Sequence, residues 1–140
     1  MHYVSLGRRL AAASVDGLIL FFGFGSAIGA LVGGFSTTSD GLEFQLDGAA
    51  ALALFASWFV YFVVLEATLG ATVGKLLFGV RVRTASGGRI GWMAALTRNL
   101  LRVFDVCFGF VGLLLILVSP RRQRIGDYAA GTIVVVPSRA

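Results

Sequence analysis

The side chains best suited to chemistry in this sequence are acids and arginines that lie within or beside long apolar runs. They are four carboxylates and three guanidinium groups: Asp16, Glu66, Asp105, Asp127, Arg9, Arg98 and Arg102. Ionisable groups inside a membrane are costly and often mark the path of an ion or a proton. Arg98 and Arg102 precede Asp105 by seven and three residues, a spacing that allows either to pair with it on a helix. Two interpretations stay open: a cation- or proton-exchanging site at Asp16 with Glu66 or Asp105, or a structural network in which the charges neutralise one another.

Other reactive combinations of side chains are missing from the sequence. A single cysteine and a single histidine exclude a disulfide framework, a Cys/His pair and a multi-thiolate metal site. The segment Gly70–Lys75 resembles a phosphate-binding loop, but only three residues separate its glycines and Leu76 stands where Ser or Thr is needed. We therefore expect a protein that is not an enzyme and that holds no cofactor and no metal.

The composition is that of an integral membrane protein with one domain over residues 1–140. Hydrophobic residues make up 57% of the chain, charged residues only 14%, and the mean hydropathy is +0.87. The net charge is +5, and the basic residues gather beside the apolar runs. This pattern indicates contact with the lipid bilayer and its anionic headgroups, and not with a nucleic acid.

Two long apolar runs must position the charged groups, and they predict full transmembrane helices at residues 10–33 and 49–68. At ~1.5 Å per residue, a helix of this length covers the ~30 Å hydrocarbon core of a bilayer. Asp16 follows Arg9 by seven residues, so both side chains leave one face of the first helix, two turns apart. Glu66 comes near the end of the second run, at about the depth of Asp16.

Charge asymmetry predicts the orientation of these helices. Arg8 and Arg9 precede the first run, whereas the polar loop at residues 35–48 contains acids and no basic residue. Basic residues mark cytoplasmic loops. We therefore expect the N-terminus to be cytoplasmic and the loop to be outside.

A third apolar run, at residues 103–119, is short for a full crossing and has basic residues on both sides. A simple third span would place the arginines that follow it outside, against the positive-inside rule. The sequence therefore favours a re-entrant hairpin that turns near Gly109 and Gly112, since irregular backbone is tolerated at membrane depth when protein covers it. A third full span is the alternative.

The polar segments predict a small sheet and an amphipathic helix. Apolar and basic residues alternate at residues 80–83, and a Ser-Gly-Gly turn follows at 86–88, which predicts a β-hairpin on the cytoplasmic face. Residues 132–136 are suited to a third strand. Residues 91–105 carry one apolar stripe, which is typical of an amphipathic helix. The predicted fold is thus an all-α membrane protein with two full spans, a third membrane segment and a small cytoplasmic β-hairpin or sheet.

Three glycines at four-residue spacing, Gly25, Gly29 and Gly33, lie in the second half of the first run. Small residues at this spacing let helix backbones approach closely in a membrane. We therefore expect close helix packing here, and a homo-oligomer or a membrane partner protein.

Several segments, in this order, resemble the RDD domain family of small bacterial membrane proteins, which is named for one arginine and two aspartates. The segments are RRLAAASVD, GATVGKLLFGVRVRTASGGRI, LTRNLLRVFD and SPRRQRIGDYAAGTIVVV. The second of them keeps the family's GxTxGK pattern. Together they cover nearly the whole chain.

The resemblance carries residue roles and a general function. The family's arginine corresponds to Arg9, its first aspartate to Asp16, and its second to Asp127, with Asp105 as the other candidate. The resemblance implies a multi-pass protein of the bacterial inner (plasma) membrane that transports ions or small solutes, linked to cations or protons. The alternative is a non-transporting scaffold or accessory subunit in which the arginine and aspartates are structural.

Overall fold

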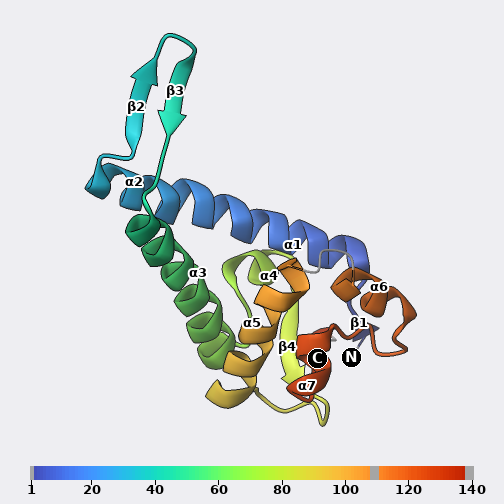
Figure 1. The fold of residues 1–140 in the computed structure, drawn as a ribbon. Helices are drawn as coiled ribbons and strands as arrows, with labels where there is room; N and C mark the ends of the chain where they lie inside the picture. Colours follow the sequence, from blue (N-terminus) through green and yellow to red (C-terminus); the bar gives the residue numbers. More distant parts are fainter. Residues whose placement is uncertain (1, 108–110, 138–140) are drawn as a thin grey trace.

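The computed structural model describes residues 2–107 and 111–137, and two long helices dominate it (Figure 1). The first runs continuously over Leu6–Val32 through α1 (Leu6–Leu18), the π-helix η1 (Ile19–Gly25) and α2 (Ser26–Val32). The second is α3 (Gly48–Leu69). Both are apolar and long enough to cross a membrane, as the two apolar runs predicted. Many of their large apolar side chains face outward, as a lipid-facing surface requires: Leu18, Phe21, Phe22, Leu31, Leu52 and Val60.

The middle of the first span is π-helical, which the apolar periodicity did not predict. In η1 the wider turns bury Leu20 and Gly25 and leave residues 21–24 exposed. Buried positions are four residues apart from Ala12 through Asp16 to Leu20, and the π-helical segment lengthens the next step to five residues, at Gly25. It separates the inward-facing charged half of the span from its apolar half.

The loop between the spans is a β-hairpin that projects beyond their ends (Figure 1). Strands β2 (Phe35–Thr38) and β3 (Gly41–Phe44) are antiparallel, with Phe35 opposite Phe44. These two aromatic rings cover Gly29, where an added Cβ would lie 2.5 and 2.8 Å from ring atoms of Phe44 and Phe35. The neighbour of Gly29 is thus the hairpin, not the helix backbone that glycine spacing predicted. Gly33 ends α2 in a left-handed conformation (φ 69°).

At the other end of the spans, three short strands join the start, middle and end of the chain. The antiparallel order is β1 (His2–Tyr3), β5 (Thr132–Val136) and β4 (Arg81–Thr84). The prediction that residues 80–83 form a hairpin is wrong, because β4 pairs with β5 and the described residues between 85 and 91 contain no strand. Val82 and Val134, in β4 and β5, pack in the main apolar cluster with residues of α3, α5 and the adjoining loops. The buried members of this cluster are Val4, Val63, Val80, Val82, Ile90, Ala95 and Val134.

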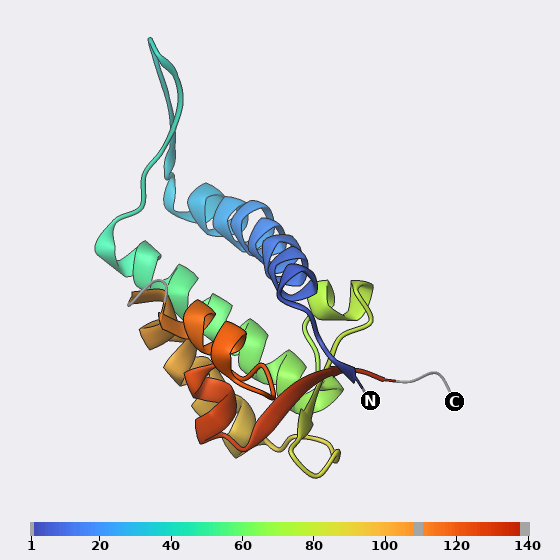
Figure 2. The ribbon, with the colours of Figure 1, turned by 90° about the vertical axis from the view of Figure 1, so that its right-hand side faces the viewer.

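Four shorter helices complete the described part of the chain. Helix α4 (Val73–Leu77) begins within the GATVGK segment, and α5 (Trp92–Cys107) is the predicted amphipathic helix. The third apolar run continues as α6 (Val111–Val118), and α7 (Ile125–Ala129) precedes β5. Of the expected hairpin turn, Gly109 lies outside the described residues, and Gly112 belongs to α6. Figure 2 shows both termini at the end of the molecule opposite β2 and β3.

Candidate functional site

Glu66, near the end of α3, is completely buried and receives three cations. Its Oε1 accepts from the Lys75 Nζ and, at 3.4 Å, from the Arg102 Nη2. Its Oε2 accepts from the Arg98 Nε at 3.0 Å and from the Asn99 amide at 3.1 Å. The carboxylate is therefore fully paired, and it ties α3 to both α4 and α5.

Asp127, in α7, is the second buried anion of the same network. It accepts from the Nη1 atoms of Arg98 and, at 3.1 Å, Arg9, and it caps α7 through the backbone N–H of Arg124 at 3.2 Å. Burial alone would raise the pKa of Asp127, but Arg98, Arg124 and Arg9 outweigh it and hold that pKa well below its usual range. Arg98 thus bridges Glu66 and Asp127.

The resulting ionic network links five helices through alternating charges. It runs from Lys75 through Glu66, Arg98 and Asp127 to Arg9, and so joins α4, α3, α5, α7 and α1. Removing one partner of a buried ion pair leaves an uncompensated charge and typically costs about 3–5 kcal/mol. Burial lowers the pKa of Lys75 to about 7, against the opposite effect of Glu66.

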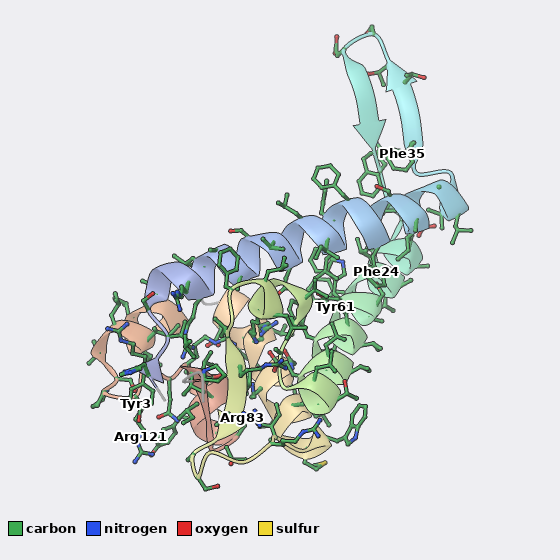
Figure 3. The ribbon with its side chains drawn as sticks, turned by 180° about the vertical axis from the view of Figure 1, so that it is seen from behind. Tyr3, Phe24, Phe35, Tyr61, Arg83 and Arg121 are labelled. Atoms are coloured by element: carbon green, nitrogen blue, oxygen red, sulfur yellow. The ribbon has the colours of Figure 1, made fainter. Side chains whose placement is uncertain are left out.

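Asp16 lies apart from this network and is held by neutral donors. Its Oδ1 accepts from the Tyr61 hydroxyl at 2.9 Å and the Gly74 N–H at 2.8 Å, and its Oδ2 accepts from the Thr72 hydroxyl at 2.5 Å. Figure 3 shows Tyr61 reaching from α3 toward the first span. Among the described residues, none of the ion pairs includes Asp16, although its exposed fraction is only 1%. Asp16 therefore fastens α4 to α1, and Arg9 is not its partner.

Each chemical feature of the GATVGK segment has a place in this arrangement. Gly70 ends α3 in a left-handed conformation (φ 67°), and Thr72 caps α4 while its hydroxyl bonds Asp16. Gly74 lets α4 touch α1, because an added Cβ would lie 2.1 Å from the Ala12 carbonyl oxygen. Lys75 turns inward to Glu66. The segment is therefore a clamp that holds α4 against α1 and α3.

Asp105 differs from the other acids because it is buried without a partner. Its exposed fraction is 8%, and neither carboxylate oxygen has a hydrogen-bond partner among the described residues. The expected pairing with Arg98 or Arg102 is not formed: Arg102 lies over the Phe62 ring, 3.9 Å from its centroid, and reaches Glu66.

A cavity of about 540 Å³ lies between the two spans and α5. Its polar end carries Asp16, Asp105 and five cations: Arg9, Lys75, Arg98, Arg102 and Arg124. Its apolar end is formed by Leu20 on the first span and by the aromatic residues Phe55, Trp58 and Phe59 on α3. No group of three or more His, Cys, Asp or Glu side chains in the described ranges is placed to hold a metal ion.

The structure brings all seven predicted residues into one region, but with different partners from those that spacing indicated. Arg9, Glu66, Arg98, Arg102 and Asp127 share one ionic network, and Asp16 and Asp105 line the neighbouring cavity without joining it. Six participants among the described residues were missed: Tyr61, Thr72, Lys75, Asn99, Arg124 and Thr132. The GxTxGK pattern signalled two of these, since it holds Thr72 and Lys75.

The fold and the site define a small helical membrane protein with a buried ionic network and an internal cavity. The model of the RDD family matches residues 3–131, and the chain belongs to this family. Searches among curated proteins and among solved structures found no match to this chain.

The Gly74 contact gives a direct test of the clamp between α1 and α4. We expect Gly74→Ala to lower the thermal unfolding temperature in mild detergent, because the new methyl group forces α4 away from Ala12 and weakens the Asp16 hydrogen bonds. The loss should be about 1–3 kcal/mol. Gly7→Ala is the matched control, because Gly7 is in α1 and nothing lies within 4 Å of an added Cβ there. Equal behaviour of the two variants would contradict the clamp.

Proposed function

We propose that this RDD family member moves a small solute across the membrane through the cavity between its spans, in a step linked to a proton or cation. The observation that carries the proposal is Asp105, an unpaired buried carboxylate on the wall of a cavity that lies between two membrane helices. A buried carboxylate without a fixed partner can gain and lose a proton with little rearrangement around it. Arg102 and Arg124 line the same cavity.

The other acids are better suited to structural work. Glu66 and Asp127 each have at least two cationic partners, and Asp16 has three hydrogen-bond donors. Protonating any of them would break several bonds at once. This network also supports the second candidate function, a non-transporting scaffold or accessory subunit, in which the charges serve the fold alone.

We also propose a topology in the bacterial inner membrane, with the N-terminus and the three-stranded sheet on the cytoplasmic side. Figure 3 shows Tyr3, Arg83 and Arg121 at one end of the molecule and Phe35 at the other. Basic residues favour the cytoplasmic side. Helix α6 has eight residues, about 12 Å, which is too short to cross a bilayer, and its exposed apolar side chains suit a re-entrant hairpin with α5.

Proton-linked transport is tested by ion flux in proteoliposomes that contain a pH dye, with Na⁺ or K⁺ gradients imposed. We expect cation-dependent proton movement from the wild type and at least a tenfold loss in Asp105→Asn, because the amide cannot exchange a proton. Asp40→Asn, in the exposed turn of the β2–β3 hairpin, is the control and should keep its flux. No flux from folded wild-type protein under any gradient would favour the scaffold, whereas full flux from Asp105→Asn would remove Asp105 from the path.

The topology is tested by cysteine labelling in intact cells, in a Cys107→Ala background that removes the native thiol. We expect Ser39→Cys, in the β2–β3 turn, to react with a membrane-impermeant maleimide from outside. Ser86→Cys, beside β4, should react only after permeabilisation. Labelling in the reverse order would invert the proposed orientation.

A further inference from the structure

We propose that the cavity between the spans binds an anionic amphiphile, a molecule with one acidic group on an apolar body. Such a molecule is either a free organic carboxylate or an anionic lipid, and both present the same chemistry to the cavity. This names the class of solute for the proposed function. That the bound molecule is moved across the membrane rests on the proposed function. Equilibrium binding tests the solute class independently of transport.

Unused donors at the polar end of the cavity point to the acidic group. Among the described residues, four guanidinium nitrogens are buried and have no hydrogen-bond partner: the Arg9 Nε, the Arg98 Nη2, the Arg102 Nε and the Arg124 Nε. All four arginines line the cavity, and the exposed fraction of Arg98 is only 1%. Buried N–H groups are almost always paired, so four unpaired guanidinium donors around one cavity indicate an acceptor that occupies it. A carboxylate or phosphate group supplies such acceptors with charge-assisted strength.

The charge balance of the cavity points the same way. Five cationic side chains line it, while two carboxylates line it and two more, Glu66 and Asp127, are bonded to those cations. One positive charge is left over when Lys75 is protonated and every carboxylate is ionised, and two are left if Asp105 also carries a proton. A buried excess charge is costly, and one anionic group offsets it. A cationic solute would add to the excess.

The opposite end of the cavity points to the apolar body. Leu20 lies eleven residues beyond Arg9, roughly 16 Å farther along the first span, and Phe55, Trp58 and Phe59 face it from α3. The volume of about 540 Å³ is within the usual range, roughly 300–1,000 Å³, for sites that enclose an organic molecule. A small hydrated anion would leave this apolar half without a partner.

The position of Trp58 provides a reporter for binding. Its indole lines the cavity, and its Nε1 has no hydrogen-bond partner among the described residues. The chain has two tryptophans, and the second, Trp92, is exposed at the start of α5 and does not line the cavity. In a Trp92→Phe background, the tryptophan fluorescence therefore comes from Trp58 alone, and the comparison of matched acidic and neutral quenchers separates cavity binding from quenching by the lipid phase.

The experiment measures quenching of Trp58 in full-length protein held in phosphatidylcholine nanodiscs. The probe is 10-bromodecanoate. The control is 10-bromodecanol, which has the same bromine quencher and the same ten-carbon chain but an uncharged hydroxyl in place of the carboxylate. We expect saturable quenching by the acid at a concentration at least tenfold lower than for the alcohol, since one lost charge-assisted contact is worth about that factor. Equal, non-saturable quenching by both compounds would overturn the proposal.

Substitutions locate the acidic group. Arg102→Gln and Arg124→Gln should each weaken binding of 10-bromodecanoate roughly tenfold and leave quenching by the alcohol unchanged. Arg121→Gln is the control, because Arg121 is exposed and does not line the cavity. Two separate arginines are tested so that poor folding of one variant leaves the other decisive. Unchanged binding in both folded variants would contradict the assigned site.

Competition experiments distinguish three cases: an anionic lipid, a free organic carboxylate, and a site that binds any small anion. Loss of the quenching when about one lipid in ten is phosphatidylglycerol would identify an anionic lipid, and its persistence would identify a free carboxylate. Competition by acetate as effective as that by decanoate would overturn recognition of an apolar body. Binding without flux would remove the proposed transport and keep this inference, whereas flux without binding would do the reverse.

Discussion

The fold depends on one completely buried guanidinium, that of Arg98. It carries Glu66 on one side and Asp127 on the other, and through them it draws Lys75 and Arg9 into the same network. Gly126 brings the backbone of α7 against Arg98, since an added Cβ would lie 2.8 Å from its carbonyl oxygen. A buried charge with two anionic partners can be satisfied in only one arrangement of its helices. The network therefore specifies how short helices close against two long ones.

The acids divide into two kinds, and the division connects the fold to the proposed function. Asp16, Glu66 and Asp127 are saturated with donors and hold α1, α3, α4 and α7 in position. Asp105 has none among the described residues and faces a cavity where arginine N–H groups are also unused. The three paired acids thus fix the positions of the helices around the cavity, and the unpaired polar groups belong to residues that line it. A cavity with fixed sides and unpaired polar groups is what a binding site for a charged solute requires.

The features that depend on hydrophobicity and periodicity along the chain could be predicted from the sequence. The two spans follow from the length of the apolar runs against the thickness of a bilayer, and helix α5 follows from its apolar stripe. The family was also identified from its motifs, and the family model confirms it. These features need no knowledge of which segments meet in space.

Partner choice could not be predicted in the same way. Arg98 and Asp105 are well spaced to pair within one helix. Arg98 instead donates to Glu66 on α3 and Asp127 on α7, because two carboxylates stabilise its charge better than one. Strand β4 does not pair with the segment that follows the adjacent turn. It pairs with β5, because that register buries Val82 beside Val134. The π-helical turn and the rings over Gly29 likewise depend on contacts with distant segments.

The pH dependence of stability reveals whether Asp127 is an ionised anchor of the buried network. A carboxylate whose pKa is lower in the folded state stabilises the fold above the unfolded pKa, near 4, and that stability is lost as the pH falls below it. The measurement is the free energy of unfolding in bicelles from pH 6 to pH 3, for wild type, Asp127→Asn and the exposed control Asp40→Asn. We expect a steep loss of stability toward pH 3 in the wild type and in Asp40→Asn, and a markedly smaller loss in Asp127→Asn, which starts lower. The same slope in all three proteins would contradict the account.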